Sequence, residues 1–81
     1  MSLDHRGHLR LAWEAVGRGG LAGALVDVPP VLREMAREAG APERYDHVLT
    51  VAYLEAVAAR WRPGEPFDAF LARSPELFER P

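Results

Sequence analysis

Five residue types are missing from the chain: cysteine, lysine, isoleucine, asparagine and glutamine. Without cysteine there are no disulfides, thiolate nucleophiles or cysteine-ligated zinc sites. Without lysine there is no Schiff-base or lysine-base chemistry. The serine and threonine hydroxyls are reduced to Ser2, Ser74 and Thr50, and none of them lies in a nucleophile-elbow pattern. These absences argue against covalent catalysis, so the sequence leans away from an enzyme.

Runs of a single charge are also absent. All ten basic residues are arginines scattered among twelve acidic residues, which gives a formal net charge of −2. Nucleic-acid-binding domains normally carry a basic patch, so we expect no nucleic-acid partner. The sequence shows no signal peptide, lipidation motif or membrane-spanning stretch. We therefore expect no membrane association and a cytoplasmic location.

The chain does contain one strongly apolar stretch, from about 43 to 62. At 100° per residue its apolar side chains fall on nearly every face, which is typical of a helix surrounded by other helices. With 48% hydrophobic residues, the 81-residue chain predicts a single domain, 1–81. The expected fold class is all-α, a small bundle of four or so helices in up-down-up order around this central helix. So short a chain can hardly cover such a helix, which favours a homodimer.

Apolar spacing and helix-ending residues predict the helices before the central one. The first covers 4–16, with Asp4 as its cap. Its end is predicted from three glycines, namely Gly17, Gly19 and Gly20. A short helix at 21–26 should follow, then a kink at Pro29-Pro30 because proline lacks a backbone donor, and then a helix over 29–39.

After the central helix, the spacing of three apolar residues predicts a short amphipathic helix. These residues are Phe67, Phe70 and Leu71. The sequence Ser74-Pro75-Glu76 then resembles a helix cap followed by a first-turn proline and a first-turn acid, which predicts a last turn containing Leu77 and Phe78.

Polar residues interrupt the apolar stripes at two helix starts. His5 and His8 continue the core-facing stripe of the first helix, while Asp46 and Thr50 lie one turn apart near the start of the central helix. In an up-down-up bundle these two starts lie at the same end. Two imidazoles and one carboxylate are the ligands of many divalent transition-metal sites. We therefore take His5, His8 and Asp46 as candidate metal ligands.

The same end of the bundle is also a candidate site for a small organic ligand. Thr50 can donate a hydrogen bond there, and Tyr45 and Tyr53 can place their hydroxyls at its rim. A purely structural alternative stays open. Asp46 can favour the positive end of its helix dipole, Thr50 can bond back to the Asp46 carbonyl, and the cluster can do no more than fix helix register.

Three segments resemble a group of short, uncharacterised bacterial all-helical proteins. The first two are His5-x-x-His8-Leu9-x-x-Ala12-Trp13 and Arg44-Tyr45-Asp46-x-x-Leu49-Thr50-x-Ala52-Tyr53, and the third is the tail Phe67-x-x-Phe70-Leu71-x-x-x-Pro75-x-Leu77. The resemblance implies a helical fold and marks four polar positions of interest, namely His5, His8, Asp46 and Thr50. Asp46 stands where the group tends to have histidine, and Val48 where it tends to have threonine.

Two classes of function follow from the sequence. One is a small soluble protein that binds a metal or a small ligand through the histidine–histidine–aspartate cluster. The other is a structural or protein-interaction module, either a homodimer or an accessory subunit, in which the polar cluster binds nothing. Catalytic residues cannot be assigned from this sequence.

Overall fold

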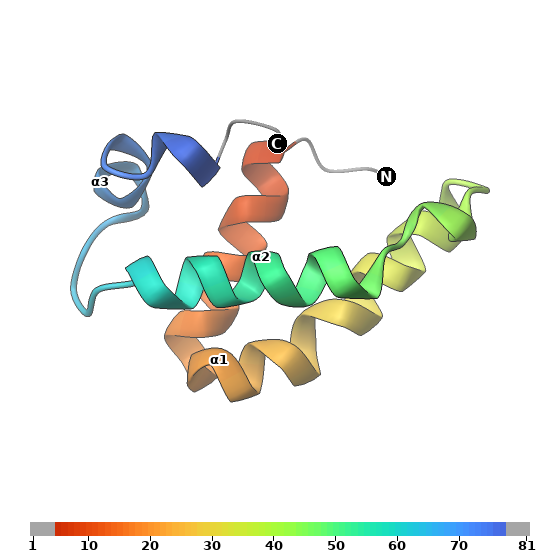
Figure 1. Ribbon diagram of the computed structural model, residues 1–81, viewed down its shortest axis with the longest axis horizontal. Coiled ribbons are helices and arrows are strands. Elements are labelled where there is room, and N and C mark those ends of the chain that lie inside the picture. The colour runs from red at the N-terminus through yellow and green to blue at the C-terminus, as the bar shows by residue number, and fades with distance from the viewer. Residues whose placement is uncertain (1–4, 78–81) are drawn as a thin grey trace.

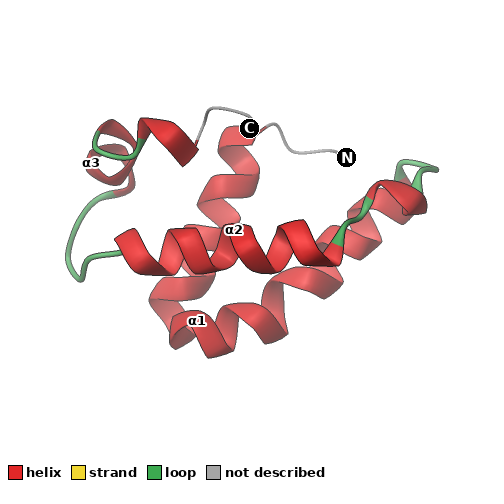
Figure 2. Cartoon of the chain, in the orientation of Figure 1, coloured by secondary structure: helices red, strands yellow, loops and turns green. Residues whose placement is uncertain are grey.

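A computed structural model describes residues 5–77, and within that range all regular structure is helical (Figures 1 and 2). The all-α class predicted from the sequence is confirmed. The elements are α1 (His5–Glu38), a 3-10 turn (Pro42–Arg44), α2 (His47–Arg60), α3 (Phe67–Ala72) and a second 3-10 turn (Pro75–Leu77). The predicted cap at Asp4 and the predicted contribution of Phe78 lie outside the described residues.

Helix α1 consists of two helices joined at Gly20. The backbone of Gly20 has φ 67° and ψ −167°, a region that essentially only glycine occupies. The first helix thus continues through Gly17 and Gly19, beyond the predicted end at residue 16. Figure 1 shows the result: the first part of α1 crosses α2 steeply, whereas the second part runs alongside α2 in the opposite direction.

The predicted division into separate helices over 21–26 and 29–39 is wrong, because α1 stays helical through Pro29 and Pro30. Two i→i−4 hydrogen bonds are lost there, to the carbonyls of Leu25 and Val26. Both of these residues are exposed, so water can satisfy their carbonyls. Val28 and Pro29 are themselves buried, and their packing holds the helix together across the proline pair.

Helix α2 is shorter and less enclosed than predicted. It begins at His47, and the residues before it form the 3-10 turn and the cap. Only Leu54 and Val57 are fully buried, whereas Val48 is 76% exposed and Leu49 is 64% exposed. The prediction that other helices surround this helix is therefore wrong for the single chain. Its apolar residues on the outer face remain in contact with solvent.

The core lies where the first part of α1 meets the other helices. Phe70, Leu9, Leu54 and Val57 are the largest fully buried apolar side chains. Helix α3 brings its aromatic rings against Trp13, whose ring centroid lies 5.2 Å from that of Phe67 and 6.5 Å from that of Phe70. These contacts confirm the predicted short helix.

The loop between α2 and α3 is held by Arg73. Its guanidinium group makes two hydrogen bonds of 2.7 and 2.8 Å to the Glu65 carboxylate and a third to the Arg60 carbonyl. The hydrogen bonds from Arg73 lower the pKa of Glu65. Because this ion pair is only partly exposed and bidentate, it fixes where α3 packs.

Candidate functional site

A cavity of about 390 Å³ lies between the two parts of α1 and the start of α2. We call it the α1–α2 cavity. One wall comes from the first part of α1, with His5, His8 and Ala12, and a second wall from the other part of α1. That second wall is entirely apolar and comprises Val28, Leu32, Met35, Ala36 and Ala39. The steep crossing created at Gly20 separates these two walls and so produces the hollow.

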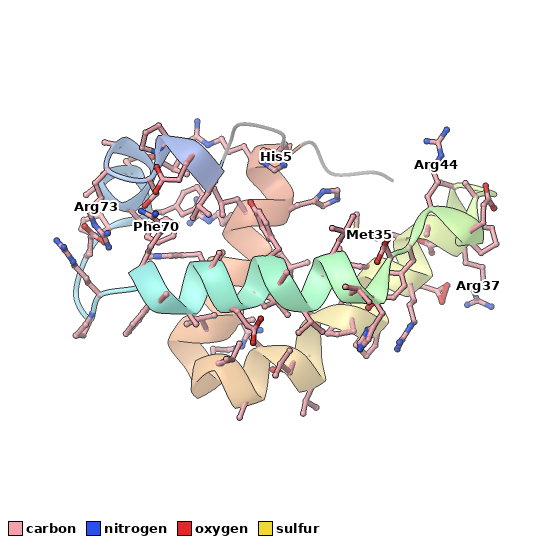
Figure 3. All side chains as sticks on the ribbon, in the orientation of Figure 1. His5, Met35, Arg37, Arg44, Phe70 and Arg73 are labelled. Atoms are coloured by element: carbon pink, nitrogen blue, oxygen red, sulfur yellow. The ribbon has the colours of Figure 1, made fainter. Side chains whose placement is uncertain are left out.

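The third wall runs from the 3-10 turn into α2. It carries the polar candidates Tyr45, Asp46, Thr50 and Tyr53, and Arg44 stands beside them. The structure therefore brings all six predicted site residues to a single cavity. Figure 3 shows His5, Met35 and Arg44 on the same side of α2. Ala12, Val28 and Leu54, at most 2% exposed, form the apolar floor, whereas Arg44 and Asp46 lie at the exposed rim.

His5 and Tyr53 meet at one backbone oxygen. The His5 Nε2 lies 2.8 Å from the Leu77 carbonyl oxygen, to which the Tyr53 hydroxyl also donates at 3.3 Å. A carbonyl only accepts, so Nε2 carries the proton. The two rings pack at 5.9 Å between centroids. Burial raises the pKa of Tyr53 to about 12, and its hydroxyl therefore remains a donor at neutral pH.

Asp46 is the cap of α2. Its Oδ1 accepts a hydrogen bond of 3.0 Å from the Leu49 amide, and its backbone is extended, as a cap residue requires. Thr50 Oγ1 donates to the Asp46 carbonyl at 2.8 Å. Both contacts are the ones that the structural alternative requires. One Asp46 carboxylate oxygen is thus already bonded to its own helix.

The predicted metal ligands share the cavity but are not gathered into one ligand set. Among residues 5–77 no group of three or more histidine, cysteine, aspartate or glutamate side chains is placed to hold a metal ion. His5 Nε2 is directed at the Leu77 carbonyl, and Asp46 at the Leu49 amide. The metal site remains a prediction that this geometry does not support.

Tyr45 also belongs to a second cluster on the outer side of the 3-10 turn. Its hydroxyl lies 2.7 Å from His47 Nδ1, and the Arg33 guanidinium lies 4.9 Å from the centre of its ring. Arg33 Nη2 is 3.4 Å from the same His47 nitrogen. Because Arg33 can only donate, His47 Nδ1 is the acceptor in this contact. His47 is exposed.

Sequence reasoning missed two parts of the cavity. Leu32, Met35 and Ala36 follow a core-facing stripe, but they are only half-buried because they line the cavity. Arg44 went unnoticed because arginine next to a turn is ordinary at a protein surface. The detectable signal is its position directly before Tyr45 and Asp46, where its side chain must share their end of the bundle.

Comparisons of the chain with protein-family models, with curated proteins and with solved structures return no match. The resemblance to the group of short helical proteins therefore remains a prediction. Within residues 5–77 no helix is long and apolar enough to cross a membrane.

Proposed function

We propose that this protein binds a small organic molecule in the α1–α2 cavity. The observation that carries the proposal is the cavity itself, about 390 Å³ with an apolar floor and a few polar groups at its rim. Small-molecule sites are usually concave, mostly apolar and equipped with a small number of orienting polar groups. His5, His8, Thr50 and Tyr53 supply those groups here.

An organic ligand fits this geometry better than a metal ion. The cap contact occupies one oxygen of Asp46, and the Leu77 carbonyl faces His5 Nε2. A metal bound through His5 Nε2 would displace the hydrogen bond to Leu77, whereas an apolar molecule between Leu32, Met35 and Leu54 displaces neither contact. The ligand's apolar body would lie on the floor of the cavity and its polar end at the rim.

A fragment library screened by two-dimensional NMR tests the proposal. We expect fragments to shift the resonances of Leu32, Met35 and Tyr53 together. Ala36→Phe places a ring in the cavity and should abolish these shifts. Ala22→Phe, on the exposed face of the same helix, is the matched control and should preserve them. The proposal is wrong if no fragment binds or if the shifts lie away from the cavity.

Thermal melting with and without Zn²⁺ tests the metal hypothesis on the same protein. A melting temperature raised by Zn²⁺ in the native chain and in His47→Ala, but not in His5→Ala or His8→Ala, would establish a metal site and overturn the preference for an organic ligand. The difference with and without metal is compared within each variant, because His5→Ala also removes the Leu77 hydrogen bond.

A second candidate function is that of an interaction module, and the exposed apolar side chains of α2 favour it. Val48 and Leu49 are large, adjacent and mostly exposed, as is Val26 on α1. Two copies joined along α2 would bury Val48 and Leu49, in line with the homodimer expected from the sequence. Light scattering after gel filtration should then show a dimer, and Val48→Glu should convert it to a monomer.

A further inference from the structure

The arginine at the rim of the α1–α2 cavity has no acidic partner among the described residues. Arg44 lines the cavity, and within residues 5–77 its guanidinium group forms no ion pair or hydrogen bond. Most other described arginines are paired with acids, among them Arg6 with Asp68 and Arg73 with Glu65. Among residues 5–77 the only carboxylate that lines the cavity is that of Asp46.

Asp46 forms no ion pair with Arg44 but caps its own helix. One carboxylate oxygen of Asp46 accepts the Leu49 amide, and its charge faces the positive end of the α2 dipole. The remaining ionisable side chains of the lining are His5, His8, Tyr45 and Tyr53, none of which is negative at neutral pH. The rim is therefore electrostatically suited to an anion.

The dimensions of the cavity limit the apolar part of the ligand. At roughly 30 Å³ per nonhydrogen atom, as in a condensed liquid, about 390 Å³ holds about a dozen such atoms. The floor, formed by Ala12, Val28 and Leu54, is apolar and buried, so the chain of the ligand would lie there. Arg44 stands at the exposed rim, on the same side of α2 as Met35 (Figure 3).

We infer, on the basis of the proposed function, that the ligand of the α1–α2 cavity is a free amphipathic carboxylate. It has an aliphatic chain of about ten carbons, and its carboxylate pairs with Arg44. The guanidinium group of arginine matches a carboxylate with two parallel hydrogen bonds. The aliphatic chain gains its free energy of binding by leaving water for the apolar floor. A cationic amphiphile with a chain of the same length would be repelled by Arg44, because both groups are positively charged.

Calorimetric titration with three probes of equal chain length tests this inference. These probes are decanoate, 1-decanol and decyltrimethylammonium, each below its micellar concentration. We expect decanoate to bind most tightly and decyltrimethylammonium most weakly. Arg44→Gln should weaken the affinity for decanoate about three- to tenfold and leave the affinity for decanol unchanged. Arg62→Gln is the matched control, because Arg62 is likewise exposed and forms no ion pair with described residues.

The outcomes separate the anion inference from the proposed function. If decanol binds as tightly as decanoate, or if Arg44→Gln changes the affinity for neither probe, the anion inference is overturned. A cavity that binds neutral molecules then remains. If no aliphatic probe binds while fragments still shift the resonances of cavity residues, the inference of an aliphatic carboxylate is wrong but the proposed function stands. If neither probes nor fragments reach the cavity, both fail. Binding that persists in Ala36→Phe would place decanoate elsewhere and overturn the inference as well.

Discussion

Asp46 and Thr50 bond to the backbone of their own helix, whereas His5 and Tyr53 bond to a carbonyl 72 and 24 residues away in the chain. The first pair follows from local spacing, because a cap residue reaches the amide three positions on. The second pair depends on where the C-terminal turn packs. Residues with the same predicted inward position therefore have different physical tasks.

The first prediction at this scale concerns the Asp46 cap. Asp46→Ala should lower the free energy of unfolding by about 1 kcal/mol, because the Leu49 amide loses its acceptor. Asp46→Asn should lower the free energy of unfolding by only a few tenths of a kcal/mol, since asparagine caps a helix nearly as well as aspartate does. Urea denaturation of the three proteins provides the comparison. An Asn variant as unstable as the Ala variant would show that the charge of Asp46 matters more than its hydrogen bond.

The second residue-scale prediction concerns Tyr53 at alkaline pH. Burial raises its pKa in the folded chain to about 12, above the ordinary value of 10. The folded state therefore holds this proton more tightly than the unfolded state. The corresponding stability is fully present below pH 10 and is lost as the pH rises towards 12.

Denaturation at pH 9 and at pH 11.5 measures this effect. At pH 9, Tyr53→Phe should lower the free energy of unfolding by about 1 kcal/mol, because the substitution removes the hydroxyl that donates to the Leu77 carbonyl. The variant should then lose less stability than the native chain between the two pH values. Equal losses in both proteins would mean that Tyr53 is solvated as in the unfolded chain.

At the scale of elements, Gly20 decides the architecture. Its backbone conformation divides α1 into one helix that crosses α2 steeply and a second that runs alongside α2 (Figure 1). The prolines, which from the sequence are the stronger helix breakers, leave the helix intact. The difference is physical: Pro29 is buried and supported by packing, whereas Gly20 is exposed, and a Cβ added to it would meet no neighbouring atom within 4 Å.

Two glycine substitutions in α1 should have opposite effects. Gly20→Ala should destabilise the protein by about 1–3 kcal/mol, because a side chain is strained at φ 67° and ψ −167°. Gly23→Ala should stabilise it by about 0.5–1 kcal/mol, because Gly23 is helical and a methyl group there meets no atom within 4 Å. Thermal melting measures both. A neutral Gly20→Ala would mean that α1 can straighten.

For the whole molecule, ligand binding and stability are linked. A ligand that binds only the folded chain adds about 1.4 kcal/mol at ten times its dissociation constant. In a domain of this size that corresponds to a rise of about 6–10 °C in the melting temperature. Decanoate should produce such a rise in the native chain and in Arg62→Gln, and a smaller one in Arg44→Gln. Equal rises in all three proteins would contradict pairing with Arg44.

Composition and periodicity predicted the elements that local physics controls. The all-α class, the position of Asp46 near a helix start and the short helix at Phe67 all follow from side-chain spacing within a few residues, although the cap role of Asp46 was not predicted. The same spacing placed His5, His8, Asp46 and Thr50 at a common end. They do share one cavity, although the first part of α1 crosses α2 steeply.

The tertiary structure alone decided what those residues contact. Spacing cannot say that His5 and Tyr53 meet at the Leu77 carbonyl, because that contact requires the C-terminal turn to fold back over the first helix. Nor can it say that Val48 and Leu49 stay exposed, since an apolar side chain is buried only if another element covers it. The cavity likewise results from the angle set at Gly20, which governs how far apart two apolar stripes come to lie.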